Sequence, residues 1–229
     1  MAFNAASWPA ALLPRIVEFT PDTQSRSGGL SMTGSEQLTV SNAGRWRAKV
    51  TVSIRGEARN LALHAFVAGM EGRAGTVLVP KFERYRPSDV NGREFSQVPA
   101  TGYSCDDFNF DLSGFGQSDD VVHAQLAVPA ASGATRLSIV INDGEGPRPG
   151  HYIGIGERLY RLQQGWGLVE GGPLQAQIWP RLRGSAAMAE RVILDRPVCL
   201  MRFADDNTGE AALNRAGSGR ATFDFVEAI

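Results

Sequence analysis

Glycine and proline interrupt the apolar segments of this chain at short intervals, and this spacing limits the structures that the chain can adopt. The 26 glycines and 12 prolines make up about 17% of the 229 residues, against an average near 12%. Most segments between them are short and alternate between apolar and polar residues. The pattern predicts a mainly β protein with one α-helix, in which short strands are joined by turns.

The clearest strand of the sequence is 45–55, followed at once by the only clear helix, 57–72. Alternate residues of the strand are apolar and predict one buried face: Trp46, Ala48, Val50, Val52 and Ile54. In the helix the apolar residues recur at three- and four-residue spacing, and Gly72 is a suitable end. We expect Leu61, Phe66 and Met70 to pack on the sheet, because neither apolar face can stay exposed to water.

The remaining segments extend the β pattern through the chain. Strands are predicted at 15–20, 76–79, 121–128, 136–142, 151–155, 159–163, 174–180, 198–203 and 221–226. Residues 22–29 and 81–118 have no clear period and are predicted to be loops. We expect an N-terminal β-rich segment, 1–118, and a C-terminal all-β segment, 119–229, or one intertwined domain. The antiparallel strands would close into a β-sandwich or a small β-barrel.

Charge and cysteine content exclude several functions. The formal net charge is −1, so no overall field attracts the chain to nucleic acid or to an anionic membrane. Only Lys49 and Lys81 accompany 21 arginines, which indicates either the base composition of the genome or guanidinium pairing at interfaces. The two cysteines, 94 positions apart, do not make a disulfide framework or a zinc site.

Two further properties concern membranes and export. No segment has the roughly 18 consecutive apolar residues that a spanning helix requires, so no membrane insertion is expected. The N-terminal segment lacks a basic region and contains Pro9 and Pro14, so it does not resemble a secretory signal. We therefore expect synthesis in the cytoplasm.

No pattern in the sequence predicts catalytic, cofactor-binding or metal-binding residues. The three histidines are not at metal-ligand spacing with one another or with a cysteine. The Gly-Ser-Gly at 217–219 is not a nucleophile motif, and 150–156 lacks the lysine and the helix of a phosphate-binding loop. The acidic pairs at 106–107, 119–120 and 205–206 are adjacent residues, which point in opposite directions on an extended chain. The chain is therefore not expected to be an enzyme.

Several motifs occur in an order that is similar to a known family. A strand with Trp-Arg-Ala at 46–48 is followed by a helix ending in GRAGTVLVP at 72–80. Later come YIGIGERLYRL at 152–162, IWPRLR at 178–183 and RPVCLMRF at 196–203. In these motifs the chain resembles minor tail proteins of long-tailed bacteriophages, particularly distal-tail or tail-tip components, and their relatives in gene transfer agents.

The resemblance implies a structural protein of the virion tail with no catalytic role. Such a protein forms a homo-oligomeric ring, with six subunits favoured over three, between the tail tube protein and a hub or baseplate protein. Arginines in and beside the motifs are candidate interface residues: Arg47, Arg158, Arg161, Arg181 and Arg183. The alternative for Arg181 and Arg183 is a solvated sheet edge. Trp179 is expected in the core, because of its large apolar area.

Two other functions fit the sequence less closely. A carbohydrate-binding β-sandwich would use the aromatic residues of 82–115 as stacking platforms, and binding to glycans would distinguish it. A small hydrolase with an unrecognised site would depend on acidic residues such as Asp106, Asp107 or Asp119.

Overall fold

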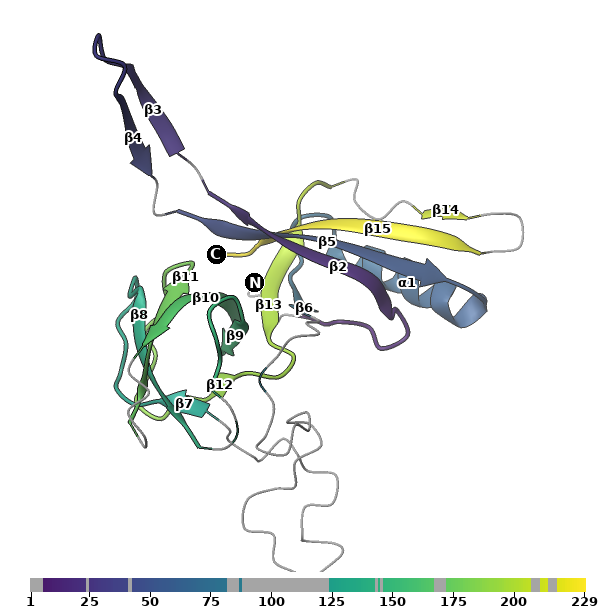
Figure 1. Cartoon of the computed structure of the whole chain (residues 1–229). Coiled ribbons are helices and arrows are strands. Elements are labelled where there is room, and N and C mark those ends of the chain that lie inside the picture. The colour runs from purple at the N-terminus through teal and green to yellow at the C-terminus, as the bar shows by residue number, and fades with distance from the viewer. Residues whose placement is uncertain are drawn as a thin grey trace, which may run out of the picture. The chain divides into compact units, whose positions relative to one another are not determined.

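The computed structural model of the chain contains two compact units (Figure 1). The sheet unit comprises Met1–Lys81 and Cys199–Ile229, and the barrel unit comprises Phe82–Val198. The structure describes residues 6–23, 25–40, 43–81, 87, 124–142, 144, 146–166, 172–206, 211–213 and 218–229. The chain thus leaves the sheet unit at Lys81 and returns to it at Cys199, whereas the sequence placed a boundary between residues 118 and 119.

A mixed sheet of seven strands forms the sheet unit, in the order β1-β6-β13-β15-β5-β2, with β14 beside β15. Its strands are β1 (Ala6–Ser7), β2 (Pro14–Asp22), β5 (Arg45–Ile54), β6 (Val77–Pro80), β13 (Val198–Phe203), β14 (Ala211–Leu213) and β15 (Gly219–Glu227). β1 and β6 are parallel, whereas β15 is antiparallel to both β13 and β5. Strand β15, the last in the chain, therefore lies between β13 and β5 in the middle of the sheet, whereas the first two strands, β1 and β2, lie at its edges.

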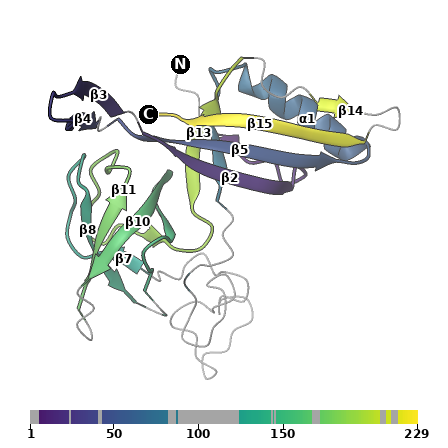
Figure 2. The same cartoon turned by 45° about the horizontal axis from the view of Figure 1, so that its top comes forward.

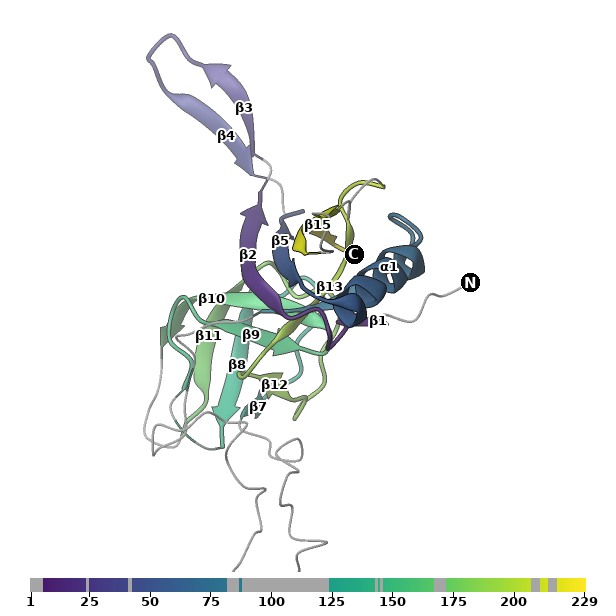
Figure 3. The same cartoon turned by 90° about the vertical axis from the view of Figure 1, so that its right-hand side faces the viewer.

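The helix α1 (Glu57–Met70) lies along one face of this sheet, as Figure 2 and Figure 3 show. Strand β5 alternates as predicted, with every second residue from Trp46 to Ile54 buried toward the core. Phe66 of α1 meets the rings of Phe223 at 5.6 Å and Phe203 at 5.9 Å between centroids. Trp8 closes this aromatic cluster at 5.4 Å from Phe66. Edge-to-face packing of this kind adds to the free energy of burial.

The buried face of α1 differs in part from the prediction. Phe66 and Met70 are buried as expected, but Leu61 is 60% exposed and Leu63 is buried in its place. Leu63, Phe66 and Met70 follow a three- and four-residue spacing that aligns Phe66 with the aromatic cluster. Leu61 lies two positions from Leu63, nearly on the opposite side of the helix, so it was wrongly assigned to the core.

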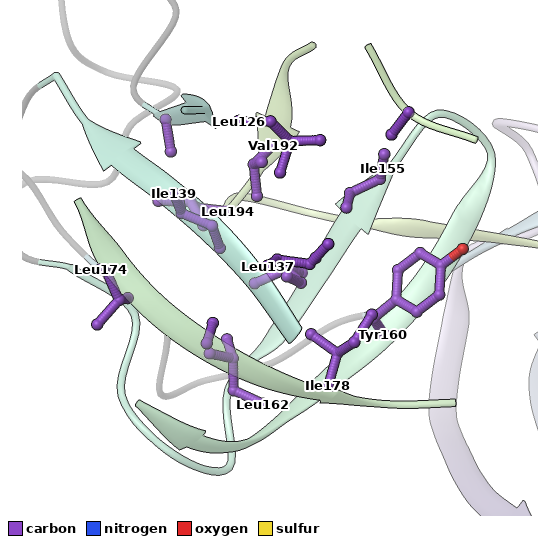
Figure 4. Packing of buried hydrophobic residues seen from close by; sticks show 14 of the residues in the cluster. Leu126, Leu137, Ile139, Ile155, Tyr160, Leu162, Leu174, Ile178, Val192 and Leu194 are labelled. Atoms are coloured by element: carbon purple, nitrogen blue, oxygen red, sulfur yellow. The ribbon is translucent and has the colours of Figure 1, made fainter. Parts of the chain in front are cut away.

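The barrel unit is a six-strand antiparallel sheet that is nearly closed, in the order β12-β9-β10-β11-β8-β7. Its strands are β7 (Ala124–Leu126), β8 (Arg136–Ile141), β9 (Tyr152–Ile155), β10 (Arg158–Trp166), β11 (Leu174–Trp179) and β12 (Val192–Ile193). Backbone bonds from Leu126 to Glu190 (3.0 Å) and from Ala189 to Leu126 (2.9 Å) draw its ends together. Inward side chains such as Leu137, Ile139 and Ile178 fill the interior (Figure 4).

The predicted fold class, mainly β with one helix, is confirmed. Each strand predicted from alternation overlaps an observed strand. Within residues 22–29, which were predicted to be a loop, β3 (Ser25–Leu30) instead pairs with β4 (Glu36–Val40). Of the predicted loop at 81–118, all but Lys81 and Pro87 lies outside the described residues.

Candidate protein–protein interface

An exposed β-hairpin is the most unusual surface of the sheet unit. We call it the arm, residues 25–40, formed by β3 and β4 as a separate two-stranded sheet. The arm continues beyond the end of the main sheet where Asp22 pairs with Arg45 (Figure 1). The side chains of residues 25–39 are all exposed to solvent. An isolated two-stranded hairpin is at best marginally stable in water, so this element lacks the burial that normally holds a hairpin.

The two faces of the arm differ in polarity. In the register of the hairpin Ser27 pairs with Leu38 and Leu30 pairs with Glu36. Because paired residues share a face and alternate residues of a strand do so too, Leu30 and Leu38 lie on the same face. The opposite face carries Arg26, which pairs with Thr39. Arg26 and Glu36 are the only charged residues of the arm, and Glu36 and Ser27 lie on the same exposed face as the two leucines, so this face is mixed in polarity.

A network of hydroxyl groups shapes the tip of the arm. The Oγ of Ser31 lies 2.6 Å from the Oγ of Ser35 and 2.8 Å from the Oγ1 of Thr33. The backbone N–H of Ser35 donates to the Ser31 Oγ at 3.1 Å. These bonds close the turn around Met32, whose side chain is fully exposed. The tip therefore presents one more apolar side chain to solvent.

Charged side chains fix the base of the arm. Asp22, the last residue of β2, accepts from the Nε of Arg47 at 2.9 Å and from the Nε of Arg45 at 3.2 Å. These hydrogen bonds, Arg47 first, lower the pKa of the Asp22 carboxyl. On the next strand the buried Glu227 carboxylate accepts from the backbone N–H of Trp46 at 3.0 Å. The first residues of β5 are thus held where the arm joins the sheet.

A second distinctive surface lies on the outside of the barrel. Arg161 of β10 pairs with Tyr152 on β9 and with Trp179 on β11, so the three side chains form one row. The guanidinium of Arg161 lies 5.5 Å from the centre of the Tyr152 ring. Trp179 is half-buried on this outer face, and Ile178 and Leu182 fill the core instead. The expectation that Trp179 is a core residue was therefore wrong, because strand alternation turns it outward.

The five candidate arginines are divided between the two units. Arg47 lies at the base of the arm in the sheet unit, and the other four lie in the barrel unit: Arg158, Arg161, Arg181 and Arg183. Arg181 is exposed directly after the cis peptide bond between Trp179 and Pro180. The backbone N–H of Arg183 donates to the buried Tyr160 hydroxyl at 3.1 Å. Their interface role stays a prediction, and the arm is the surface that sequence reasoning missed.

The motif after the helix has a structural explanation. The backbone N–H of Arg73 donates to the Asp206 carboxylate at 3.0 Å, and the N–H of Gly75 donates to the Met70 carbonyl at 2.8 Å. A Cβ on Gly75 would lie 2.5 Å from that carbonyl oxygen, so the chain requires glycine there. Asp206, one of the acidic pairs noted in the sequence, therefore holds a turn.

The part of the chain that the structure describes contains neither a candidate metal site nor a candidate membrane-spanning helix. No group of three or more histidine, cysteine, aspartate or glutamate side chains there has a geometry that could hold a metal ion. No helix among the described residues has the length and apolar character needed to cross a membrane.

Comparison with known proteins adds no family assignment. No protein-family model matches the chain, and no curated protein sequence matches it either.

Proposed function

We propose that this protein is a structural component of a bacteriophage tail tip, or of the equivalent part of a gene transfer agent. It forms a homo-oligomeric ring, six subunits favoured over three, that joins the tail tube protein to a hub or baseplate protein. Its role is assembly and not catalysis. The motif resemblance described above is the source of the tail assignment.

The observation that carries the proposal is the arm. The hairpin exposes the apolar side chains of Leu30, Met32 and Leu38 to solvent, and exposed apolar side chains favour association with another surface. The sheet unit from which it extends has its own buried core, so the arm is not needed to complete the fold. A sheet unit with its own core and a projecting hairpin suits a building block of a ring.

Detection in particles tests the proposal. Particles purified from cells that carry the encoding genome should contain the chain, and antibody-gold labelling should place it at the distal end of the tail. Labelling of the major tube or capsid protein in the same preparation is the control. Particles with intact tails that lack the chain would refute the proposal.

A further inference from the structure

We infer that three arginines of the sheet unit form a binding site for a compact dianion, a phosphate group: Arg45, Arg47 and Arg202. The site lies on the face of the sheet opposite α1 and does not depend on the proposed tail function. It rests on three observations: the strand register, the guanidinium groups that the subunit leaves without partners, and the charges around them.

Cross-strand pairing brings the three arginines to one region of the sheet. Arg202 of β13 pairs with Val226 of β15, and Val226 pairs in turn with Arg47 of β5. Paired residues share a face, so Arg202 and Arg47 lie on either side of Val226, about 10 Å apart between Cα atoms. Arg45 precedes Arg47 by two residues and lies on the same face. Phe203, next to Arg202, contacts Phe66 of α1, so this face is the one opposite the helix.

Arg202 is an arginine that the subunit's own fold leaves without a partner. Its Nε is buried and has no hydrogen-bond partner among the residues that the structure describes. Buried polar groups in native proteins are nearly always paired, and an unpaired guanidinium nitrogen costs free energy. The residue as a whole is only partly buried, so a solute can approach its side chain. An anion bound by the guanidinium would offset the cost of its burial.

Arg45 and Arg47 also have donors that are not used. Each donates its Nε to the same oxygen of Asp22, Oδ2, at 3.2 Å and 2.9 Å respectively. Neither side chain makes another hydrogen bond or ion pair within the described part of the chain, so the terminal amino groups of both guanidinium groups are available. Three arginines and the single carboxylate of Asp22 leave two positive charges without a counter-charge.

These charges favour a phosphate group over other anions. A phosphate group carries a charge of about −1.5 to −2 at neutral pH, which matches the two uncompensated positive charges. Guanidinium groups bind its oxygens through paired, charge-assisted hydrogen bonds. The next row of the same face has Glu18 and Asp224 on either side of Lys49. Their carboxylates would repel an extended polyanion such as nucleic acid, so the site favours a compact anion.

Titration of full-chain variants with inorganic phosphate tests the inference. Arg202→Met should weaken phosphate binding by at least about tenfold, as expected for the loss of a charge-assisted hydrogen bond. Arg220→Met is the matched control, because Arg220 is exposed on the same face but lies about 20 Å along β15 from Val226. It should weaken binding by less than about twofold at physiological ionic strength. Equal losses in the two variants would overturn the site.

Arginine side-chain NMR locates the anion in the unmodified chain. Phosphate should shift the Nε–H signals of Arg45, Arg47 and Arg202 with one dissociation constant, and sodium chloride at the same ionic strength should not. Acetate, with a single charge, should bind more weakly than phosphate. Signals of these arginines that do not respond to phosphate, or that respond equally to acetate, would overturn the inference.

Thermal unfolding separates a binding role of Arg202 from a structural one. In phosphate-free buffer Arg202→Met should unfold at the same temperature as the unmodified chain or at a higher one, because the substitution removes a partly buried, unpaired charge. Phosphate should then raise the unfolding temperature of the unmodified chain more than that of the variant. A large decrease in phosphate-free buffer would show that Arg202 supports the fold and would overturn the inference.

Discussion

Gly75 illustrates how one residue explains a motif that was recognised only by resemblance. The Gly72–Gly75 turn brings the chain from α1 back to the sheet, and the Met70 carbonyl lies where a Gly75 Cβ would be. A Cβ on Gly69, on the exposed side of α1, would have no atom within 4 Å beyond the adjacent backbone of the helix itself. Glycine is therefore required at position 75, whereas position 69 can hold a side chain.

Alanine substitution should separate these two positions. Gly75→Ala should lower the free energy of unfolding by about 1–3 kcal/mol, because backbone atoms must move to admit the methyl group. Gly69→Ala should raise it by about 0.5–1 kcal/mol, because alanine is the better helix former. Chemical denaturation of both variants measures the difference. Equal stability of the two variants would show that the turn tolerates a side chain.

The carboxyl group of Asp22, at the base of the arm, should have a lowered pKa. Its pKa is below the ordinary value because Arg47 and Arg45 bond the ionised carboxylate. The stabilisation is therefore complete above about pH 4 and is lost as the pH falls through the folded pKa. NMR titration should show that Arg47→Ala raises the pKa of Asp22 more than Arg45→Ala does. An unchanged pKa in Arg47→Ala would contradict the geometry of this base.

Strands and the helix were predictable because each has a local period. Strand β5 alternates through ten residues, and α1 has regular apolar spacing. β3 was not predictable, because its sequence, Ser-Arg-Ser-Gly-Gly-Leu, has neither alternation nor β-branched residues, and only pairing with β4 reveals it. The helix face was ambiguous for a similar reason, since most of its other apolar residues are small alanines that do not distinguish Leu61 from Leu63.

Substitutions in α1 should confirm which face is buried. Phe66→Ala should cost about 3–5 kcal/mol of stability, because it removes the ring that contacts Phe203 and Phe223. Leu61→Ala should change stability by less than about 0.5 kcal/mol, because the side chain is exposed. The denaturant midpoints of the two variants give the comparison. A larger loss of stability from Leu61→Ala than from Phe66→Ala would show that Leu61 is part of the core.

The division into two units could not be deduced from the sequence. It depends on β15, whose Phe225 pairs with Ala48 far earlier in the chain, and such long-range pairing leaves no local pattern. The candidate interface had the same difficulty. The arginine content predicted contact residues that lie mainly in the barrel unit, whereas Leu30 and Leu38 share an exposed face only through the register of β3 with β4, which has no local sequence pattern.

The arm should be separable from the stability of the molecule as a whole. Replacing residues 25–40 with a short Asn-Gly turn leaves the pairing of β2 with β5 intact, so the unfolding temperature should change little. Association should be lost in the same variant. A large decrease in the unfolding temperature would show that the arm is part of the core fold.

Native mass spectrometry of the purified full chain tests the proposed ring most directly. Six copies of the 24.6 kDa chain should give a single assembly of about 148 kDa, with no larger species, because a closed ring leaves no contact surface free to bind another copy. A mass of 24.6 kDa at every protein concentration, or an open series of masses without a limit, would contradict the ring.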